Sequence, residues 1–328
     1  MTLAETSFVS TESSASFIEG KSPRQLAWAR FRSDRFAMFA VGIIVLYALV
    51  AALAPLICSV LGISPYELDG KALNDFGLPK GSFGGISAEH WLGVEPGTGR
   101  DILARLIYGA RISMLVGFLA TVVTTSLGIV IGVISGYKRG KVDAVIGRIT
   151  DLTLAFPSLL LIIALTRPIT QRLESMGIPE GNPARIAYII LVLGLFGWVY
   201  VARIVRGQTL SLREREFVEA ARASGASTRR IVFKELMPNL WAPVIVTVTL
   251  ALPGYVATES TLSFLGLGML PPTASWGAML GDSVRYYRAD PTYLFIPGIA
   301  LSVLVLAFNI VGDAVRDALD PKADRQSL

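Results

Sequence analysis

Long uninterrupted apolar runs dominate the pattern of hydrophobic and polar positions along this chain. Six of them approach or exceed the roughly 20 residues that a helix rising about 1.5 Å per residue needs to cross a hydrocarbon core. They cover residues 36–57, 112–135, 145–166, 186–202, 240–258 and 293–312. The fifth run continues past Glu259. Soluble helices alternate polar and apolar faces, whereas these runs do not. The pattern therefore predicts an all-α integral membrane protein with six transmembrane helices, and not a soluble bundle of six buried helices.

Composition and charge fit a membrane protein with a defined orientation. The 328 residues are 52% hydrophobic and 17% charged, and their mean hydropathy is +0.56. Six spans place residues 1–35, 136–148, 203–239 and 313–328 on one side, which carries 20 of the 30 Lys and Arg residues. The positive-inside rule predicts that this side is cytoplasmic. The net charge of +5 then reflects basic loops beside the lipid bilayer, and no nucleic acid partner is expected.

These patterns divide the chain into six parts. We predict a disordered cytoplasmic tail at 1–20, a basic interfacial helix at 21–35, the first transmembrane helix at 36–58, an extracytoplasmic loop with an amphipathic helix at 59–111, a core of five transmembrane helices at 112–313 and a cytoplasmic tail at 314–328. The first 20 residues do not resemble a cleaved signal peptide, because they lack a basic n-region and an apolar core.

Glycine and proline mark special positions within the spans. Gly128, Gly132 and Gly136 are four residues apart, so three missing side chains share one helix face where another helix can approach. We favour this packing role over a role in substrate binding. Prolines at positions 157, 243 and 253 remove backbone hydrogen bonds in or near spans, where they predict kinks or mobile half-helices.

A polar, helix-prone segment separates the fourth and fifth spans. Residues 214–224 contain no Gly or Pro, and Gly225 then interrupts them. Glycine readily takes the left-handed conformation that ends a helix, and Ser227 or Thr228 can cap a second helix that stops before Pro238. The loop 207–239 is thus predicted to hold two short helices joined at a bend. Its small residues either fit the groove of another protein or form a solvated surface.

The residues required for catalysis are not found in this sequence. There is no G-x-x-x-x-G-K-[ST] loop, so the chain is not expected to hydrolyse ATP itself. The lone histidine, His90, lies in an outer loop and is expected to be a surface residue. The lone cysteine, Cys58, is expected to be a buried inert thiol. We therefore predict no enzyme activity, no metal site and no cofactor in this chain.

The polar segment contains a known motif. Glu219, Ala220, Ala221 and Gly225, in the order E-A-A-x-x-x-G, resemble the cytoplasmic EAA loop of permease subunits in bacterial ABC importers. The family form ends in I-x-L-P, whereas this chain has the letters ELMP at 235–238, a departure at two positions. The stretches HWLGVEPGTGRDILARLIYGARIS, DLTLAFPSLLLII, ESTLSFLGLGMLPPTASWGAML and FNIVGDAVRDALDP look like those of the dipeptide, oligopeptide and nickel permease group, specifically its C-type subunit. The resemblance covers roughly residues 21–322.

The resemblance implies a type I ABC importer permease fold and a set of partners. A homologous second permease subunit, two ATP-binding subunits that hold ATP and Mg²⁺, and an extracytoplasmic substrate-binding protein complete such importers. The first helix of the EAA loop docks on an ATPase subunit and transmits its movement. On this basis coupling is assigned to Glu216, Glu219, Ala220, Ala221, Arg222 and Gly225. A Gly225→Val substitution is expected to uncouple transport.

The residues leave alternatives open for the cargo and for the driving force. The cargo is expected to be a short peptide, but dipeptides, oligopeptides, glutathione and nickel chelates are all handled in the group. The main alternative is a secondary transporter or channel driven by an ion gradient, which would gain support if Glu259 faced a cavity at mid-membrane. We expect Glu259 to be a structural acid at a helix break, not a ligand for a substrate's ammonium group. The segment 167–185 is predicted to be an unusually long outer loop.

Overall fold

The computed structural model describes residues 22–320, and helices make up most of them. The predicted tail at 1–20 lies outside this range. The helices are α1 (Pro23–Ser33), α2 (Arg35–Ala52), α3 (Ala54–Leu61), the short η1 (Gly70–Ala72), α4 (Ile102–Lys138), α5 (Gly140–Ala155), α6 (Ser158–Ser175), α7 (Asn182–Leu212), α8 (Glu216–Ala223), α9 (Thr228–Arg230), the π-helical η2 (Ile231–Leu236), α10 (Met237–Phe264), α11 (Trp276–Ser283) and α12 (Thr292–Leu319).

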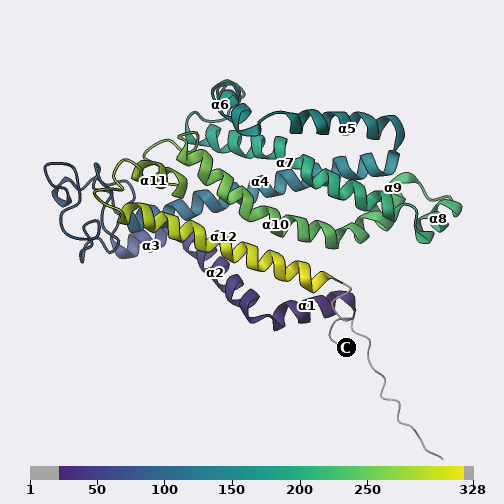
Figure 1. Cartoon of the computed structure of the whole chain (residues 1–328), viewed down its shortest axis with the longest axis horizontal. Coiled ribbons are helices and arrows are strands. Elements are labelled where there is room, and N and C mark those ends of the chain that lie inside the picture. Colours follow the sequence, from purple (N-terminus) through teal and green to yellow (C-terminus); the bar gives the residue numbers. More distant parts are fainter. Residues whose placement is uncertain (1–21, 321–328) are drawn as a thin grey trace, which may run out of the picture.

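Membrane-spanning helices form the body of the protein, which confirms the predicted fold class. Five helices are long and apolar enough to cross a bilayer: α2, α4, α7, α12 and the continuous stretch Thr228–Phe264. The pair α5 and α6 counts as a sixth span if the two helices are taken together. The loop 62–101 lies at one end of the molecule and α8 with α9 at the other (Figure 1).

The third predicted span, 145–166, is wrong as a continuous helix. α5 ends at Ala155, α6 begins at Ser158, and the two axes differ by 89°. Phe156 is extended at φ −85° and ψ 137°, the conformation that a following proline favours, and Pro157 then leads into α6. In Figure 1, α6 is seen nearly end-on, whereas α5 runs across the view. The predicted long outer loop is also wrong, because α6 runs to Ser175 and only residues 176–181 lie outside helices.

Three other boundaries differ from those predicted. The first span is divided at Leu53 into α2 and α3. The predicted amphipathic helix of the outer loop is the first part of α4, which starts at Ile102 after its N-cap Asp101 and runs without a break into the second span. The helix α12 continues to Leu319, past residue 312 where the predicted sixth span ends and into the predicted C-terminal tail. Near that end, Arg30 of α1 donates a hydrogen bond to the backbone oxygen of Asp320 (3.3 Å), which places the two ends of the described chain together.

The glycine row of α4 packs on α7, as predicted from its spacing. A Cβ added at Gly128 would lie 2.4 Å from Cβ of Val201. One added at Gly132 would lie 2.7 Å from the backbone oxygen of Ala202. A similar clash, 2.7 Å from Cβ of Thr209, would occur at Gly136. Glycine thus allows α4 and α7 to meet at backbone distance.

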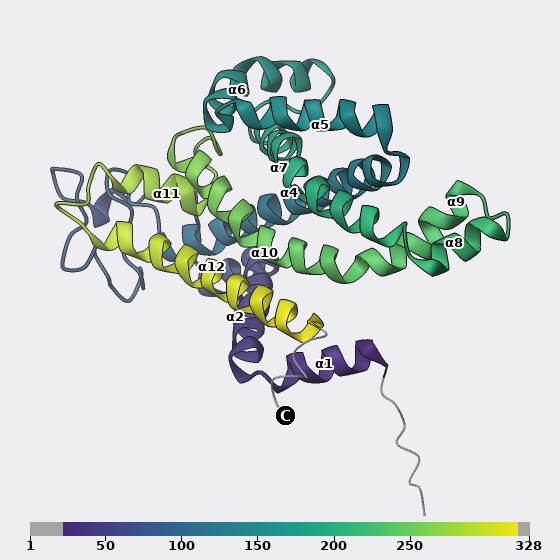
Figure 2. The same ribbon diagram turned by 45° about the vertical axis from the view of Figure 1, so that its right-hand side comes forward.

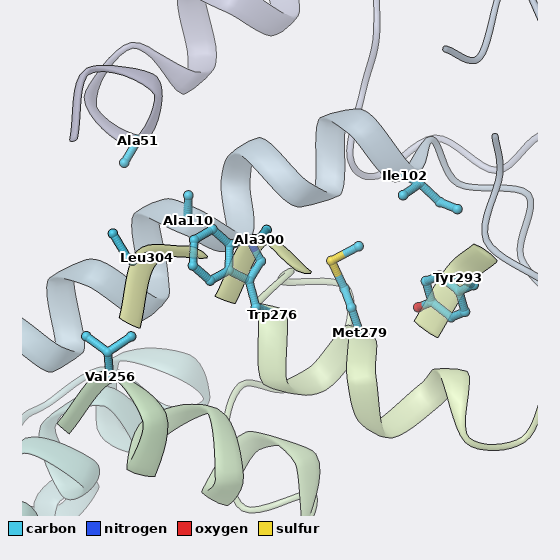
Figure 3. Packing of buried hydrophobic residues seen from close by; sticks show 9 residues of the cluster. All are labelled: Ala51, Ile102, Ala110, Val256, Trp276, Met279, Tyr293, Ala300 and Leu304. Atoms are coloured by element: carbon cyan, nitrogen blue, oxygen red, sulfur yellow. The ribbon is translucent and has the colours of Figure 1, made fainter. Parts of the chain in front are cut away.

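A buried cluster around Trp276 joins α11 to α4 and α12 (Figure 3). The indole Nε1 of Trp276 donates to the backbone oxygen of Leu106 (2.9 Å), and its ring lies against Gly109. Ala110, Met279 and Ala300 are part of the same cluster. The helix α11 is therefore fixed to the half of the bundle that carries the loop 62–101.

Buried charged residues hold the loop 62–101 in place. Arg100 pairs with Glu95 at 2.7 Å, and Glu95 also accepts a hydrogen bond from the hydroxyl of Tyr293 in α12. His90 is not a free surface residue as predicted: its Nδ1 lies 2.8 Å from Oδ2 of Asp101, and its Nε2 lies 3.5 Å from Asp69. His90, Asp101 and Asp69 are too far apart in the sequence for a helical or strand periodicity to predict their contact.

A candidate coupling surface between α7 and α10

The segment between α7 and α10 is the candidate site. α7 ends at Leu212, and α8 follows after three residues. A bend at Gly225 leads to α9, which continues through the π-helical η2 into α10. The short helix α8 is therefore linked to one long helix at each end. It lies with α9 at one tip of the molecule (Figures 1 and 2).

The bend has the hydrogen bonds of a Schellman motif. Gly225 has φ +76°, its N–H donates to the oxygen of Arg222 (2.9 Å), and the N–H of Ala226 donates to the oxygen of Ala221 (3.0 Å). This pattern requires a left-handed residue after the helix, which explains glycine at this position. A Cβ at Gly225 would meet nothing within 4 Å, so the requirement comes from backbone conformation and not from space.

The second helix is capped as predicted but does not end as predicted. The hydroxyl of Ser227 accepts a hydrogen bond from the N–H of Arg230. The helix then passes through Pro238 and continues to Phe264. In η2 the hydrogen bonds reach five residues back, so the N–H of Met237 bonds to the oxygen of Val232. Pro238, which has no N–H, lies in the first turn of α10 directly after this change of pattern, where the missing donor is tolerated.

An apolar inner face fixes α8 to η2. Val218, Ile231 and Leu236 are almost fully buried and form one cluster, against which Ala221 and Ala226 pack. Ala221 was predicted to belong to the coupling surface, but it is half-buried and faces this cluster. Its small side chain therefore serves the close packing of the two helices.

The other predicted coupling residues lie on the outside. Glu216, Glu219, Ala220, Arg222 and Gly225 are all exposed. Glu216, Glu219, Ala220 and Ala223 recur at helical spacing, which gives α8 a small outer face with two acids in its first turn. Arg222 is less free than expected, because its guanidinium lies 5.8 Å from the centre of the Tyr137 ring. Tyr137 and its partner Arg213 were not predicted, since their contact joins positions 76 residues apart.

Glu259 lies within α10, and so the prediction of an acid at a helix break is wrong. The side chain is fully buried and accepts hydrogen bonds from the hydroxyls of Ser263 (2.7 Å) and Ser260 (3.4 Å). It lies five positions before the end of α10 at Phe264. The hydroxyl partners satisfy this acid within the protein, which fits a structural role.

Two families match this sequence. Residues 128–325 match the family described as "Binding-protein-dependent transport system inner membrane component". Residues 22–76 match "N-terminal TM domain of oligopeptide transport permease C". The two matches together include most of the described chain.

Individual relatives and a solved structure are similar over most of their length. The oligopeptide transport system permease protein OppC of Bacillus subtilis is 39% identical over 90% of this chain and 88% of its own. The dipeptide transport system permease protein DppC of Haemophilus influenzae is 35% identical over 92% of this chain and 96% of its own. A structure of the inward-facing MetNI methionine ABC transporter has a chain with a TM-score of 0.54 and 21% identity, covering 67% of this chain and 98% of that one. This last similarity concerns the fold alone.

Proposed function

Since this chain belongs to the family of binding-protein-dependent transport system inner membrane components, we propose that it forms half of the translocation path for short peptides in an ATP-driven importer. It is a multi-pass inner membrane permease subunit and not itself the ATPase. The buried, hydroxyl-bonded Glu259 gives no support to the rival view of a secondary transporter or channel driven by an ion gradient.

The proposed cargo is a dipeptide or a longer peptide. The support is that relatives named for oligopeptide and for dipeptide transport align over about nine-tenths of the chain. Glutathione and nickel chelates are the competing cargoes. The lone His90 is engaged by two aspartates, so it offers no free imidazole for a metal chelate.

The proposed complex contains four kinds of subunit. This chain would pair with a homologous second permease, two ATP-binding subunits would bind ATP and Mg²⁺ below them, and an extracytoplasmic substrate-binding protein would deliver the peptide. We place both termini and the segment 207–239 in the cytoplasm. The excess of basic residues on that side and the contact between Arg30 and Asp320 support this orientation.

The proposed mechanism is alternating access driven through α8. ATP binding would draw the ATPase subunits together, and α8, lying in a groove of one of them, would follow. The observation that carries this proposal is the exposed face of α8 around Ala220, mounted between two spanning helices through a buried cluster. A rigid mounting transmits displacement to α7 and α10, whereas a flexible loop would absorb it.

The proposal can be tested by tagging the chain and identifying what co-purifies in mild detergent. We expect a second permease and one or two ATPases with the wild type. Ala220→Arg should lose the ATPases but keep the second permease, because it places a long charged side chain on the proposed contact. Ala88→Arg is the matched control, since Ala88 is exposed in the outer loop at the opposite end of the molecule. Purification of the wild type alone, or ATPases retained by Ala220→Arg, would contradict the proposal.

A further inference from the structure

The turn between α4 and α5 contacts the segment that carries α8. Tyr137, near the end of α4, lies beneath two guanidinium groups: Arg213 at 5.7 Å and Arg222 at 5.8 Å from the ring centre. The Nη1 of Arg213 also donates a hydrogen bond to the backbone oxygen of Tyr137. Arg213 stands just before α8, and Arg222 is in its last turn. One aromatic ring thus contacts the residue that caps the end of α7 and the last turn of α8.

A second contact lies beside the first. The Nη2 of Arg139 is 2.9 Å from Oε1 of Glu214, and the two side chains are about half exposed. An exposed ion pair of this kind adds little stability. Its role in this inference is to orient the α4–α5 turn relative to the segment before α8. Arg139 has φ +53°, which L-residues rarely adopt, and Gly140 follows at φ +59°. This uncommon backbone closes the turn and directs the chain into α5.

A carboxylate then ties α5 to its neighbours. Arg206 of α7 binds both oxygens of Asp143 in α5, and the second of these hydrogen bonds is 2.6 Å long. The hydroxyl of Ser135 in α4 donates to the same carboxylate. Three helices therefore meet at Asp143, one turn beyond the Tyr137 contact.

The packing of α5 differs from that of α4 against α7. A cavity of about 260 Å³ lies between α5 and the other two helices, lined by both polar and small residues including Asp143, Arg206 and Gly132. The opposite side of α5 exposes Val145, Ile149 and Leu152. A few polar contacts, and not close packing, therefore hold α5 against α4 and α7. A displacement of its first turn can then move the whole helix.

We propose that the α4–α5 turn is a second attachment of the coupling segment, through which displacement of α8 reaches α5 and the broken span α5–α6. In this arrangement Tyr137 is a positioning residue, and Arg139 and Asp143 keep the turn in register. This inference rests on the proposed function, because it assumes that an ATPase moves α8. The inference adds a route by which movement of α8 reaches α5 and α6. These two helices are not next to α8 along the chain, since α7 lies between them and α8.

The test uses the assembled importer in proteoliposomes and two readouts. The first is the amount of labelled di- or trialanine imported per ATP hydrolysed. The second is independent of cargo: the rate at which a thiol reagent labels Leu152→Cys in α5, with and without a non-hydrolysable ATP analogue. In the parent, the nucleotide should change the labelling rate. With Tyr137→Ala this change should disappear and import per ATP should fall roughly fivefold or more, since two cation–π contacts are lost.

Controls separate this inference from the proposed function. Tyr137→Phe keeps the ring and should behave as the parent, as should Lys138→Ala, an exposed neighbour on the same turn. If Tyr137→Ala does not assemble, Arg139→Glu should block the response and the double change Arg139→Glu with Glu214→Arg should restore it. A nucleotide response that survives in Tyr137→Ala, or in Arg139→Glu alone, overturns the inference. A parent that imports neither peptide, but still responds to nucleotide, contradicts the proposed cargo only.

Discussion

Gly128 of α4 lies directly against Val201 of α7, so that a Cβ on the glycine would sit 2.4 Å from Cβ of the valine. Two carbon atoms cannot approach so closely without movement of the helices. Gly128→Ala should therefore lower the stability of the protein by about 1–3 kcal/mol, the usual cost of overpacking. The thermal unfolding midpoint of the purified complex in detergent measures this effect.

A matched control for this substitution lies in α2. A Cβ at Gly42 would meet nothing within 4 Å, so Gly42→Ala should leave the midpoint unchanged or raise it slightly. If Gly128→Ala and Gly42→Ala lowered the unfolding midpoint equally, the close approach of α4 and α7 would not explain the effect of Gly128→Ala. Gly132→Ala offers a repeat of the first experiment one turn further along α4.

These glycines also show what can be predicted from sequence. A spacing of four residues identifies a helix face directly, and a glycine followed by a capping serine identifies the bend at Gly225, because both signals are local. Prolines are less informative. Pro157 breaks a span, whereas Pro243 and Pro253 lie inside the continuous α10. The difference depends on neighbours, since α10 packs against α4 and α12 while α5 and α6 lie at the edge of the bundle.

Side-chain contacts between particular residues of distant segments could not be predicted. The coupling motif was visible as E-A-A-x-x-x-G, but the motif alone did not separate the exposed Ala220 from the half-buried Ala221. Nor did any periodic pattern connect Tyr137 with Arg213. Such contacts depend on how α4 and α7 pack, which places their ends side by side only after the whole bundle has formed.

His90 should make the loop 62–101 more stable at acidic pH. Its burial lowers the pKa, but hydrogen bonds with Asp101 and Asp69 and their negative charges outweigh this and raise the pKa above the ordinary 6.5. A raised pKa gives stability that is fully present below that value and is lost as pH rises through the folded-state pKa. The wild type should thus unfold at a higher temperature near about pH 6 than near about pH 8.5, by a margin that His90→Asn reduces. The same pH dependence in both proteins would contradict this prediction.

Glu259 should tolerate the loss of its charge but not the loss of its acceptor. Glu259→Gln keeps an oxygen for the hydroxyl of Ser263, so uptake should stay near that of the wild type. Glu259→Ala leaves two buried serines without this partner, and stability should fall by about 1–3 kcal/mol. Peptide uptake and the unfolding midpoint are measured on the same preparations. If Glu259→Gln assembled normally but abolished uptake, the charge itself would be required, as in an ion-driven transporter.

Gly225 allows coupling to be separated from assembly. Its φ of +76° costs an L-residue about 1–2 kcal/mol, and the cost is greater for a β-branched side chain. Gly225→Val should therefore unwind the bend and reduce uptake while the two spans and the second permease remain in place. Gly225→Asn is the matched variant, because asparagine tolerates the left-handed conformation and the site has open space for a side chain. Import per ATP hydrolysed should follow the order Gly, Asn, Val. The Cβ of the valine would meet no atom within 4 Å at this site, so the substitution changes the backbone conformation of the bend and not the packing around it. Wild-type uptake by an assembled Gly225→Val complex would therefore show that the bend does not transmit movement.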